Sequence, residues 1–407
     1  MLRVLLKNII RGALKQYKVT LINLSGLILA FTALLFILNY VLYEKSFDTC
    51  FKNSDNIYRV TNYESRNGEK VYDGAKTPRG LFFSRDEIPG IEALSQAYFE
   101  SCQVKYVNDE LFEQRVLWVE EDFEKIFNLD MSIGKADFSG PLMGVISASK
   151  AKALFGKENP IGKIVKVNEG MPINITGVFE DLPSNTHLEA DYFVSAQTWV
   201  YYGWIQADGS RWRGNGWWTY IRTAKEADTK RIEHALGELI KKHIPNAASE
   251  ERNIKYSLQP LQSIHFDMSK DGDLGKKTSR TTVLMITLFG LFIMFVALIN
   301  YINLSIASAL KRETTFGIQS LIGAKPIHRI SQVVLDNFLM NVMSSTVAWL
   351  LFFLLQYPFA LVFDIPVDLA YIPGNKMFLG FILVFLPGLF ISSLLTLLPV
   401  LKINPFI

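Results

Sequence analysis

The longest uncharged stretch of the chain, residues 281–310, restricts the possible folds more than any other feature. A helix of these residues would measure about 45 Å, because each residue adds about 1.5 Å. About 20 apolar residues are enough to cross a bilayer core, so this stretch predicts a spanning helix that extends beyond the core. The basic pair Lys311-Arg312 follows at once and predicts that this end of the helix faces the cytoplasm.

Three further apolar stretches predict spanning helices at residues 19–43, 331–363 and 377–401. The first is longer than the apolar core of a cleaved signal peptide, which has about 7–15 residues, so we expect an uncleaved helix. The last contains Pro387 and Pro399, which helices in lipid tolerate when neighbouring helices satisfy the freed carbonyls.

Charge is divided between the spanning stretches and the long segment that they enclose. Residues 44–280 carry 31 Lys/Arg and 35 Asp/Glu, a net charge of −4, and the rest of the chain carries +7. The positive-inside rule then predicts four helices with both termini cytoplasmic and residues 44–280 outside, together with a short outer loop at 364–376 and a cytoplasmic tail at 402–407. A mildly acidic outer segment also argues against nucleic acid as a partner.

Residues 1–18 carry five basic residues and no acid. Their spacing places them on one helical face, opposite leucine and isoleucine, which is typical of an amphipathic helix on the inner surface of a lipid membrane. A plain basic flank of the first spanning helix remains the alternative. The basic residues are Arg3, Lys7, Arg11, Lys15 and Lys18.

The segment 44–280 has a mixed pattern of strands and helices. Asn67-Gly68 between two alternating stretches is a strong hairpin signal, and apolar residues at helical spacing predict a helix over 228–242. The predicted fold is thus a membrane protein with four transmembrane helices and a large α+β extracytoplasmic domain inserted between helices 1 and 2. The expected strands are 57–63, 70–76, 117–119, 145–147, 164–167, 173–179 and 218–222, and two further expected helices are 120–127 and 149–155.

Motifs for catalysis, cofactors or metals are missing from the sequence. Residues 156–164, GKENPIGKI, have five residues between the glycines where a phosphate loop needs four, and Ile164 replaces the Mg²⁺-binding hydroxyl. The five histidines, His187, His234, His243, His265 and His328, show no metal-ligand spacing. We therefore expect no enzyme activity, no cofactor and no metal.

Three other groups of residues have more than one interpretation. The acids Asp109-Glu110 and 120–122 are interpreted as solvated surface groups. Five tryptophans between Trp199 and Trp218, with Tyr201 and Tyr202, indicate either an aromatic core or contact, or a platform for a sugar or peptide. An oxidising compartment permits a disulfide between Cys50 and Cys102, with two unpaired cysteines as the alternative.

Polar residues near the end of the 281–310 stretch predict contacts between helices. Asn300, Asn303 and Ser305 lie in a spanning segment, where such groups find interhelical partners worth about 0.6–2 kcal/mol each. Residues 311–330 are too polar to remain in lipid and too short for a domain, so we expect a short helical element at the inner face. The predicted contact residues for an intracellular partner are Lys311, Arg312, Gly317, Gly323, Ala324 and Lys325.

Several ordered motifs resemble the MacB/FtsX type of ABC transporter permease in the form common in Bacteroidetes, here with a single module where related chains often carry two in tandem. The resemblance covers nearly the whole chain. It rests on INLSGLILAF (22–31), SFD (46–48), NIYRV (56–60), LFGKENPIGK (154–163), ITGVFEDLPSNTHLEADYFVS (175–195), LQPLQSIHF (258–266), NYINLS (300–305), FGIQSLIGAK (316–325) and LPVLKINP (398–405).

The resemblance implies an inner-membrane subunit with a MacB-like periplasmic core domain and an FtsX-like permease domain. Such subunits form dimers, here a homodimer or a heterodimer with a related permease. They bind a cytoplasmic ABC ATPase, whose motion the helices transmit to the periplasmic domain (mechanotransmission). Thr314, Thr315, Gln319 and Ser320 are neutral where the family usually carries charges, which weakens charge pairing with an ATPase.

The implied task is export or extraction of peptides, lipoproteins or lipophilic compounds, with a substrate or adaptor protein in the periplasm. The alternative is a signalling or scaffold protein that regulates a periplasmic partner such as a cell-wall hydrolase. Co-purification with an ATPase or with a hydrolase distinguishes the two.

Overall fold

The computed structural model separates the chain into two compact units. Residues 1–45 with 280–407 form one, here called the helical unit, and residues 46–279 form the other, called the α+β domain. Of the predicted interfacial helix at 1–18, only residues 11 and 16–18 are described. The described residues are 11, 16–106, 112–168, 170–206, 209–244, 247, 249, 252–311, 326–363 and 374–401.

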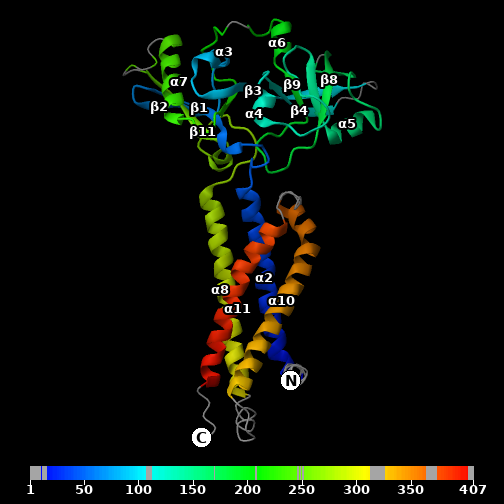
Figure 1. The fold of residues 1–407 in the computed structure, drawn as a ribbon, viewed down its shortest axis with the longest axis vertical. Coiled ribbons are helices and arrows are strands. Elements are labelled where there is room, and N and C mark those ends of the chain that lie inside the picture. The colour runs from blue at the N-terminus through cyan, green and yellow to red at the C-terminus, as the bar shows by residue number, and fades with distance from the viewer. Residues whose placement is uncertain are drawn as a thin grey trace. The chain divides into compact units, whose positions relative to one another are not determined.

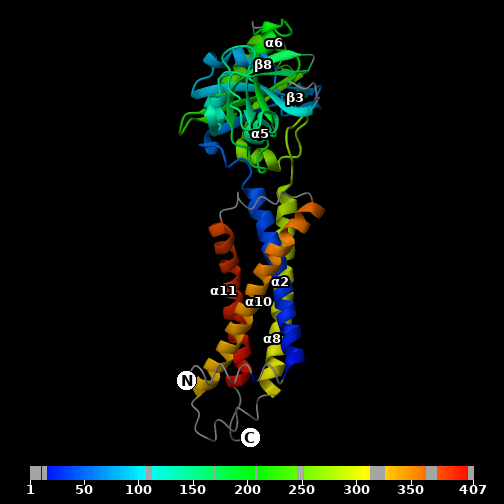
Figure 2. The same cartoon turned by 90° about the vertical axis from the view of Figure 1, so that its right-hand side faces the viewer.

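The described residues of the helical unit form four long helices, each apolar enough to cross a membrane. These are α2 (Tyr17–Lys45), α8 (Arg280–Lys311), α10 (Pro326–Phe363) and α11 (Gly374–Leu401). The start of α2 and the end of α11 lie at the same end of the unit as the end of α8 (Figures 1 and 2). The prediction of four spanning helices is confirmed.

Glycine and aromatic residues bring these helices together. A Cβ added to Gly290 would lie 2.9 Å from Ile37 Cδ1, so only a glycine lets α8 approach α2 this closely. Phe31 of α2 packs edge-on against Phe381 of α11, with 5.8 Å between ring centroids. The outer faces are also apolar, with 71% of Leu354 exposed, so lipid must cover them.

The α+β domain is built on a mixed sheet. Its described strands follow the order β11-β1-β10-β3-β4-β9-β6-β8-β5, with β2 paired to β1 and β7 paired to both β3 and β8. The strands are β1 (Ile57–Arg66), β2 (Glu69–Gly74), β3 (Ile91–Lys105), β4 (Phe112–Val119), β5 (Met131–Gly134), β6 (Met143–Ser147), β7 (Ile164–Val167), β8 (Met171–Phe179), β9 (Tyr192–Ser195), β10 (Trp218–Thr223) and β11 (Arg252–Pro260).

The two pairings of β7 close six strands, β3, β4, β9, β6, β8 and β7, into a ring that we call the barrel. Successive residues of a strand face opposite sides, so one residue in two points inward. Cys102 of β3, Trp118 of β4 and Ile173 of β8 belong to one buried cluster inside the ring. Leu117 and Phe193, on the opposite face, belong to a second core.

The two predicted hairpins are confirmed. Asn67 and Gly68 connect β1 to β2 with φ of 49° and 80°, which suits an Asn-Gly turn of type I′. The strands β7 and β8 form the second, in which Val165 is opposite Ile173.

The helices of the domain cover its sheet at two places. The predicted helix at 228–242 is confirmed as α7 (Thr229–His243), whose N-cap Asp228 accepts a hydrogen bond from Lys230 N at 3.0 Å. In Figure 1, α7 lies near β1, β2 and β11, and α5 (Ala148–Phe155) lies near β8. The shorter helices are α3 (Gly80–Phe83), α4 (Phe123–Phe127), α6 (Gln197–Tyr201), and the 3₁₀ turns η1 (Ser54–Asn56), η2 (Arg85–Glu87) and η3 (Leu261–Phe266).

Candidate functional site

The predicted coupling segment lies between α8, which ends at Lys311, and α10, which begins at Pro326. Lys311 is therefore the last residue of a described helix. The other predicted contact residues, Arg312, Gly317, Gly323, Ala324 and Lys325, lie outside the described residues.

The two helices that flank this segment share a buried hydrogen bond. The hydroxyl of Tyr301 in α8 donates to Asn337 Oδ1 in α10 at 2.8 Å, and both side chains are buried. Asn341 Nδ2 donates to the carbonyl of Asn337 at 2.8 Å, one turn away. The bond therefore joins α8 to α10 inside the unit, ten residues before the end of α8.

The predicted interhelical residues lie on both sides of this contact. Within the single chain Asn300 and Asn303 are exposed and Ser305 is half-buried. A Cβ added to Gly26 of α2 would lie 3.7 Å from Asn300 Nδ2. Their role as contacts between helices stays a prediction.

Other polar groups of the helical unit escaped the sequence analysis. Asn337 and Asn341 stand four residues apart in an otherwise apolar stretch, and this spacing was the signal that could have identified them. Among the described residues of this unit, the buried polar side chains that were not predicted are Asn23, Thr32, Glu44, Tyr301, Asn337, Asn341 and Ser344.

In the α+β domain, the residues that follow α2 directly are held by a buried network. Asn185 Nδ2 donates to Ser46 Oγ at 2.8 Å, and Asp48 N donates to Asn185 O at 2.8 Å. Asp48 Oδ1 accepts from Thr186 Oγ1 at 2.7 Å and from His187 N at 3.0 Å. Within the domain, the SFD and SNTH motifs thus fold against each other.

His187 extends this network into the core. Its Nδ1 lies 2.8 Å from Asp48 Oδ1 and its Nε2 lies 2.8 Å from the hydroxyl of Tyr220 on β10. Burial acts to raise the pKa of Asp48, but the charge of His187 and the hydrogen bonds from His187 and Thr186 outweigh it, so the pKa lies below its ordinary value. Asp48 is therefore held as a carboxylate.

The residues that precede α8 are held in the same region. The ring of His265 stacks on Phe47 at 3.4 Å between centroids, and His265 Nδ1 lies 2.8 Å from Lys276 O. Gly275 has φ of +75°, and a Cβ there would lie 2.7 Å from His187 O. The chain therefore enters and leaves the domain through one packed cluster, here called the anchor cluster: Ser46, Phe47, Asp48, Asn185, Thr186, His187, His265, Gly275 and Lys276.

A buried ion pair ties the chain's exit to the sheet. Arg59 of β1, fully buried, pairs with Asp273, and Lys277 pairs with the same carboxylate at 2.6 Å. Asp273 therefore joins β1 to the last residues of the domain. Removal of either partner would leave an uncompensated buried charge, which is strongly destabilising.

The prediction of solvated surface acids at 120–122 is wrong for Glu120 and Asp122, which are both buried. Glu120 is fully buried and pairs with Arg79, while Gln197 Nε2 donates to its Oε2 at 3.1 Å. Burial raises the pKa of Glu120 above its ordinary value, although the charge of Arg79 opposes this. The acids Asp109 and Glu110 lie outside the described residues.

The remaining candidate motifs have structural positions. Residues 156–163 connect α5 to β7, with Gly156 and Gly162 at positive φ. Cys50 is exposed and Cys102 is buried, and both are free thiols. Among the described residues, no three His, Cys, Asp or Glu side chains gather in a way that would hold a metal ion.

The tryptophan-rich segment divides into two groups. Trp212, Trp217 and Trp218 are buried, and Trp199 packs between Tyr98 and Trp118 with 5.0 Å to each ring centroid. The second group, Tyr201, Tyr202 and Trp204, is exposed. The aromatic core is confirmed for the buried group, and the platform for a sugar or peptide stays a prediction for the exposed group.

Two family models match the chain. Residues 20–239 match the MacB-like periplasmic core domain, and residues 287–404 match the FtsX-like permease C-terminal domain. The first match alone covers more than half of the chain.

One curated relative is described as an uncharacterized ABC transporter permease, YknZ, of Bacillus subtilis (strain 168). It is 21% identical over 265 residues, which are 64% of this chain and 61% of the relative, so the chain spans about three fifths of that protein.

Three solved structures resemble parts of the chain. A domain of a protein described as a permease from Porphyromonas gingivalis is 23% identical, with a TM-score of 0.46 over 58% of this chain and 98% of that one. The extracellular domain of the ABC-type transporter YknZ from Gram-positive bacteria is 18% identical, with 0.38 over 50% and 100%. The periplasmic region of MacB from Actinobacillus actinomycetemcomitans is 16% identical, with 0.36 over 49% and 88%.

Proposed function

The chain belongs to the family of ABC transporter permeases that join a MacB-like periplasmic core domain to an FtsX-like permease domain, and we propose that it transmits motion from a cytoplasmic ATPase to its α+β domain. Residues 311–325 are the docking element for that ATPase. The chain lies in the cytoplasmic membrane with both termini inside and residues 46–279 in the periplasm, where the motion serves export or extraction of a peptide, lipoprotein or lipophilic compound.

One observation carries this proposal: the four described helices of the helical unit alternate in direction, so the ends of α8 and α10 that flank the segment lie together with the start of α2 (Figure 1). The opposite ends of α2 and α8, Lys45 and Arg280, connect to the α+β domain. A displacement of residues 311–325 along the membrane normal would therefore be carried through α8, about 48 Å of helix, to the other side.

The exposed amides of α8 support a dimer. Asn300 and Asn303 are uncovered in the single chain, and an amide facing lipid loses hydrogen bonds that a second helix can provide. We propose that α8 faces a second permease subunit along this side, either another copy or a related chain. A cysteine at position 303 should then form a disulfide-linked dimer in membranes, whereas one at exposed Leu354 of α10 should not.

Capture of an ATPase tests the proposal directly. The solubilised chain should retain an ABC ATPase from its own cell, and Gly323→Pro should abolish this because proline breaks or redirects the docking element. Leu369→Pro, in the connection on the opposite side, is the control and should retain the ATPase. Equal capture by both variants would contradict the docking site, and capture of a cell-wall hydrolase without an ATPase would favour the scaffold function.

Topology is tested with thiol reagents. A cysteine introduced at Ile318 should react with a membrane-impermeant maleimide only after the membrane is opened. The native Cys50, exposed in the α+β domain, should react in sealed spheroplasts. Labelling of both from the same side would remove the basis of the proposal.

A further inference from the structure

The barrel has a gap in its wall between β3 and the β7–β8 hairpin. Val104 pairs with Val167 and Lys105 with Lys166, and Asn168 N donates to Gln103 O at 2.7 Å, but the described pairing of the two strands extends no further toward Glu100. Its antiparallel register would place Glu100 opposite Met171 if it continued. Instead these two residues line a cleft of about 1220 Å³, together with Asn168, Lys166, Tyr202 and Trp204.

Glu100 supplies a carboxylate to this cleft. It lies on the same face of β3 as Cys102, which points into the barrel, and it is half-buried. Trp118 Nε1 donates to Glu100 Oε2 at 3.0 Å and Cys102 Sγ donates to the same oxygen at 3.4 Å. Both donors are neutral, so they orient the carboxylate of Glu100 without neutralising its charge.

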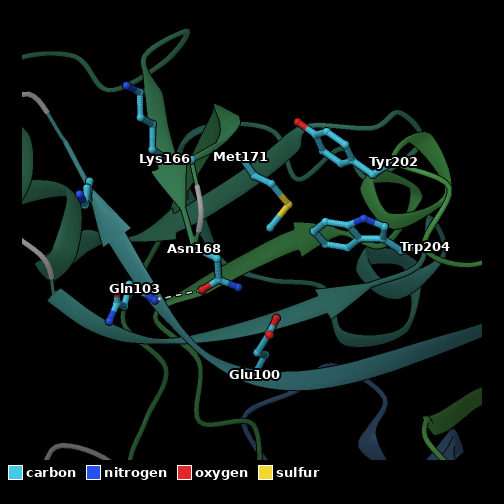
Figure 3. Close-up of a pocket in the computed structure, with 9 residues that line it drawn as sticks. Glu100, Gln103, Lys166, Asn168, Met171, Tyr202 and Trp204 are labelled. Atoms are coloured by element: carbon cyan, nitrogen blue, oxygen red, sulfur yellow. Dashed lines mark hydrogen bonds between the residues drawn. The ribbon is translucent and has the colours of Figure 1, made fainter.

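The thiol remains a donor at neutral pH. Burial raises the pKa of Cys102 to about 12, and the charge of Glu100 acts in the same direction. Because both neutral donors reach Oε2, Oε1 is the oxygen that they leave for a ligand. Figure 3 shows the side chain of Glu100 directed toward the space between Asn168, Met171 and Trp204.

The aromatic wall of the cleft belongs to the exposed group of the tryptophan-rich segment. Tyr202 and Trp204 stack with 5.5 Å between centroids and an interplanar angle of 27°. Trp204 is 56% exposed, and its backbone N–H donates to Trp199 O at 2.9 Å, which fixes the loop to the buried tryptophans. Exposed indole and phenol faces attract cations.

A carboxylate beside two aromatic faces favours an organic cation at Glu100 over a neutral sugar. Lys105 and Lys166 also line the cleft and favour a ligand that carries negative charge as well as the cation. The volume exceeds what a single ammonium or guanidinium group fills. A polypeptide with a basic side chain satisfies all three conditions.

We propose that the cleft binds a lysine or arginine side chain of a polypeptide, with the cation on Glu100 and its apolar stem against Tyr202 and Trp204. This deepens the proposed function by giving the periplasmic cargo or partner a chemical character. Binding is measured without an ATPase, so failure here would leave the coupling proposal unaffected.

The test uses the full chain in lipid nanodiscs and a blocked ten-residue peptide that carries one lysine. Thermophoresis should give binding at least about tenfold tighter than for the same peptide with glutamine in place of lysine. Glu100→Gln should remove this preference, and Trp204→Ala should weaken binding of the lysine peptide about fivefold. Glutamine keeps an oxygen acceptor for Trp118 and Cys102, so the fold should persist, which thermal melting checks.

A matched control lies on the adjacent strand. Glu113→Gln removes a carboxylate of β4 that accepts from Ser101 Oγ at 2.7 Å and does not line the cleft, so it should leave binding unchanged. The proposal is overturned if Glu100→Gln binds the lysine peptide as well as the native chain does. Binding of 1,5-diaminopentane as tight as that of the peptide would overturn the assignment to a polypeptide.

Discussion

The α+β domain buries charged groups in pairs, whereas the helical unit buries chiefly amides and hydroxyls. In the domain, Arg59 with Asp273 and Arg79 with Glu120 are each held in the core. In the helical unit, the described contact between α8 and α10 is a single hydrogen bond between Tyr301 and Asn337. Paired charges are costly to rearrange, and single hydrogen bonds in lipid are not. The difference indicates that rearrangement costs more free energy at the ion pairs of the domain than at this contact between helices.

Among the variants that test this difference between the two units, a substitution of Asp48 should cause the largest loss of stability. Asp48→Ala leaves Thr186 and His187 without their acceptor in a fully buried site, and we expect a loss of about 3–5 kcal/mol in the unfolding free energy of the domain. Chemical denaturation followed by tryptophan fluorescence measures it. Asp55→Ala, which removes an exposed contact to Gln262, should change stability by under about 0.5 kcal/mol. Similar losses of unfolding free energy for Asp48→Ala and Asp55→Ala would mean that the buried contacts of the anchor cluster stabilise the domain no more than an exposed contact does.

Gly275→Ala should rank second, with a loss of about 2–4 kcal/mol. The new Cβ would combine a strained positive φ with contact at 2.7 Å to His187 O, which is backbone and cannot give way easily. Gly68→Ala shares a positive φ, but nothing lies within 4 Å of its added Cβ, so it should cost only the strain, about 1 kcal/mol. Equal losses of stability for Gly275→Ala and Gly68→Ala would refute close packing at the anchor cluster.

Tyr301→Phe tests the helical unit and should cost about 0.6–2 kcal/mol, because it keeps the ring and removes the hydroxyl that donates to Asn337. Unfolding of the helices in mixed micelles measures the loss. Tyr357→Phe, at a side chain that is 61% exposed, is the control and should have no effect. A loss as large as that of Asp48→Ala would abolish the proposed difference between the two units.

The smallest expected effect is a pH dependence that belongs to the domain. The folded pKa of Asp48 lies below its ordinary value of 3.8, since His187 and Thr186 outweigh the effect of burial. The stability that the ionised Asp48 gives to the folded domain is therefore fully present above about pH 3.8, and it is lost as the pH falls through the folded pKa. The difference in stability between the native chain and Asp48→Asn should shrink on acidification below that pH, by at most about 1.4 kcal/mol per pH unit. A difference that grows in acid would contradict the sign.

Local patterns predicted much of this fold, because their causes are local. Asn67-Gly68 specifies its turn whatever surrounds it, and α7 buries Ile232, Leu236 and Leu239 at the spacing of a helix. The long strand β3 was missed, since buried Gln96 and half-buried Glu100 interrupt its apolar pattern. Their partners come from other strands and loops, which a local pattern does not include.

Sites formed by distant residues were the least predictable. Glu120 was interpreted as a surface acid because the acids beside it suggested solvent, yet its partner Arg79 stands far away in the sequence. The cleft has the same origin: Glu100, Met171 and Trp204 come together only when the ladder of β3 stops early. By contrast, the spanning helices depend on length and composition alone, and so they were predicted well.

The anchor cluster has a consequence for how such chains can be recombined. Asp48, His187 and His265 all lie within residues 46–279. The contacts that hold both ends of this stretch are therefore formed by residues of the stretch itself. A chimera that joins the whole stretch to the membrane helices of a related permease would keep these contacts. A crossover between Asp48 and His187 would instead combine contact residues from two different proteins. Exchange of residues 46–279 as a whole is thus the way to change the binding specificity of the α+β domain while its anchor cluster is kept.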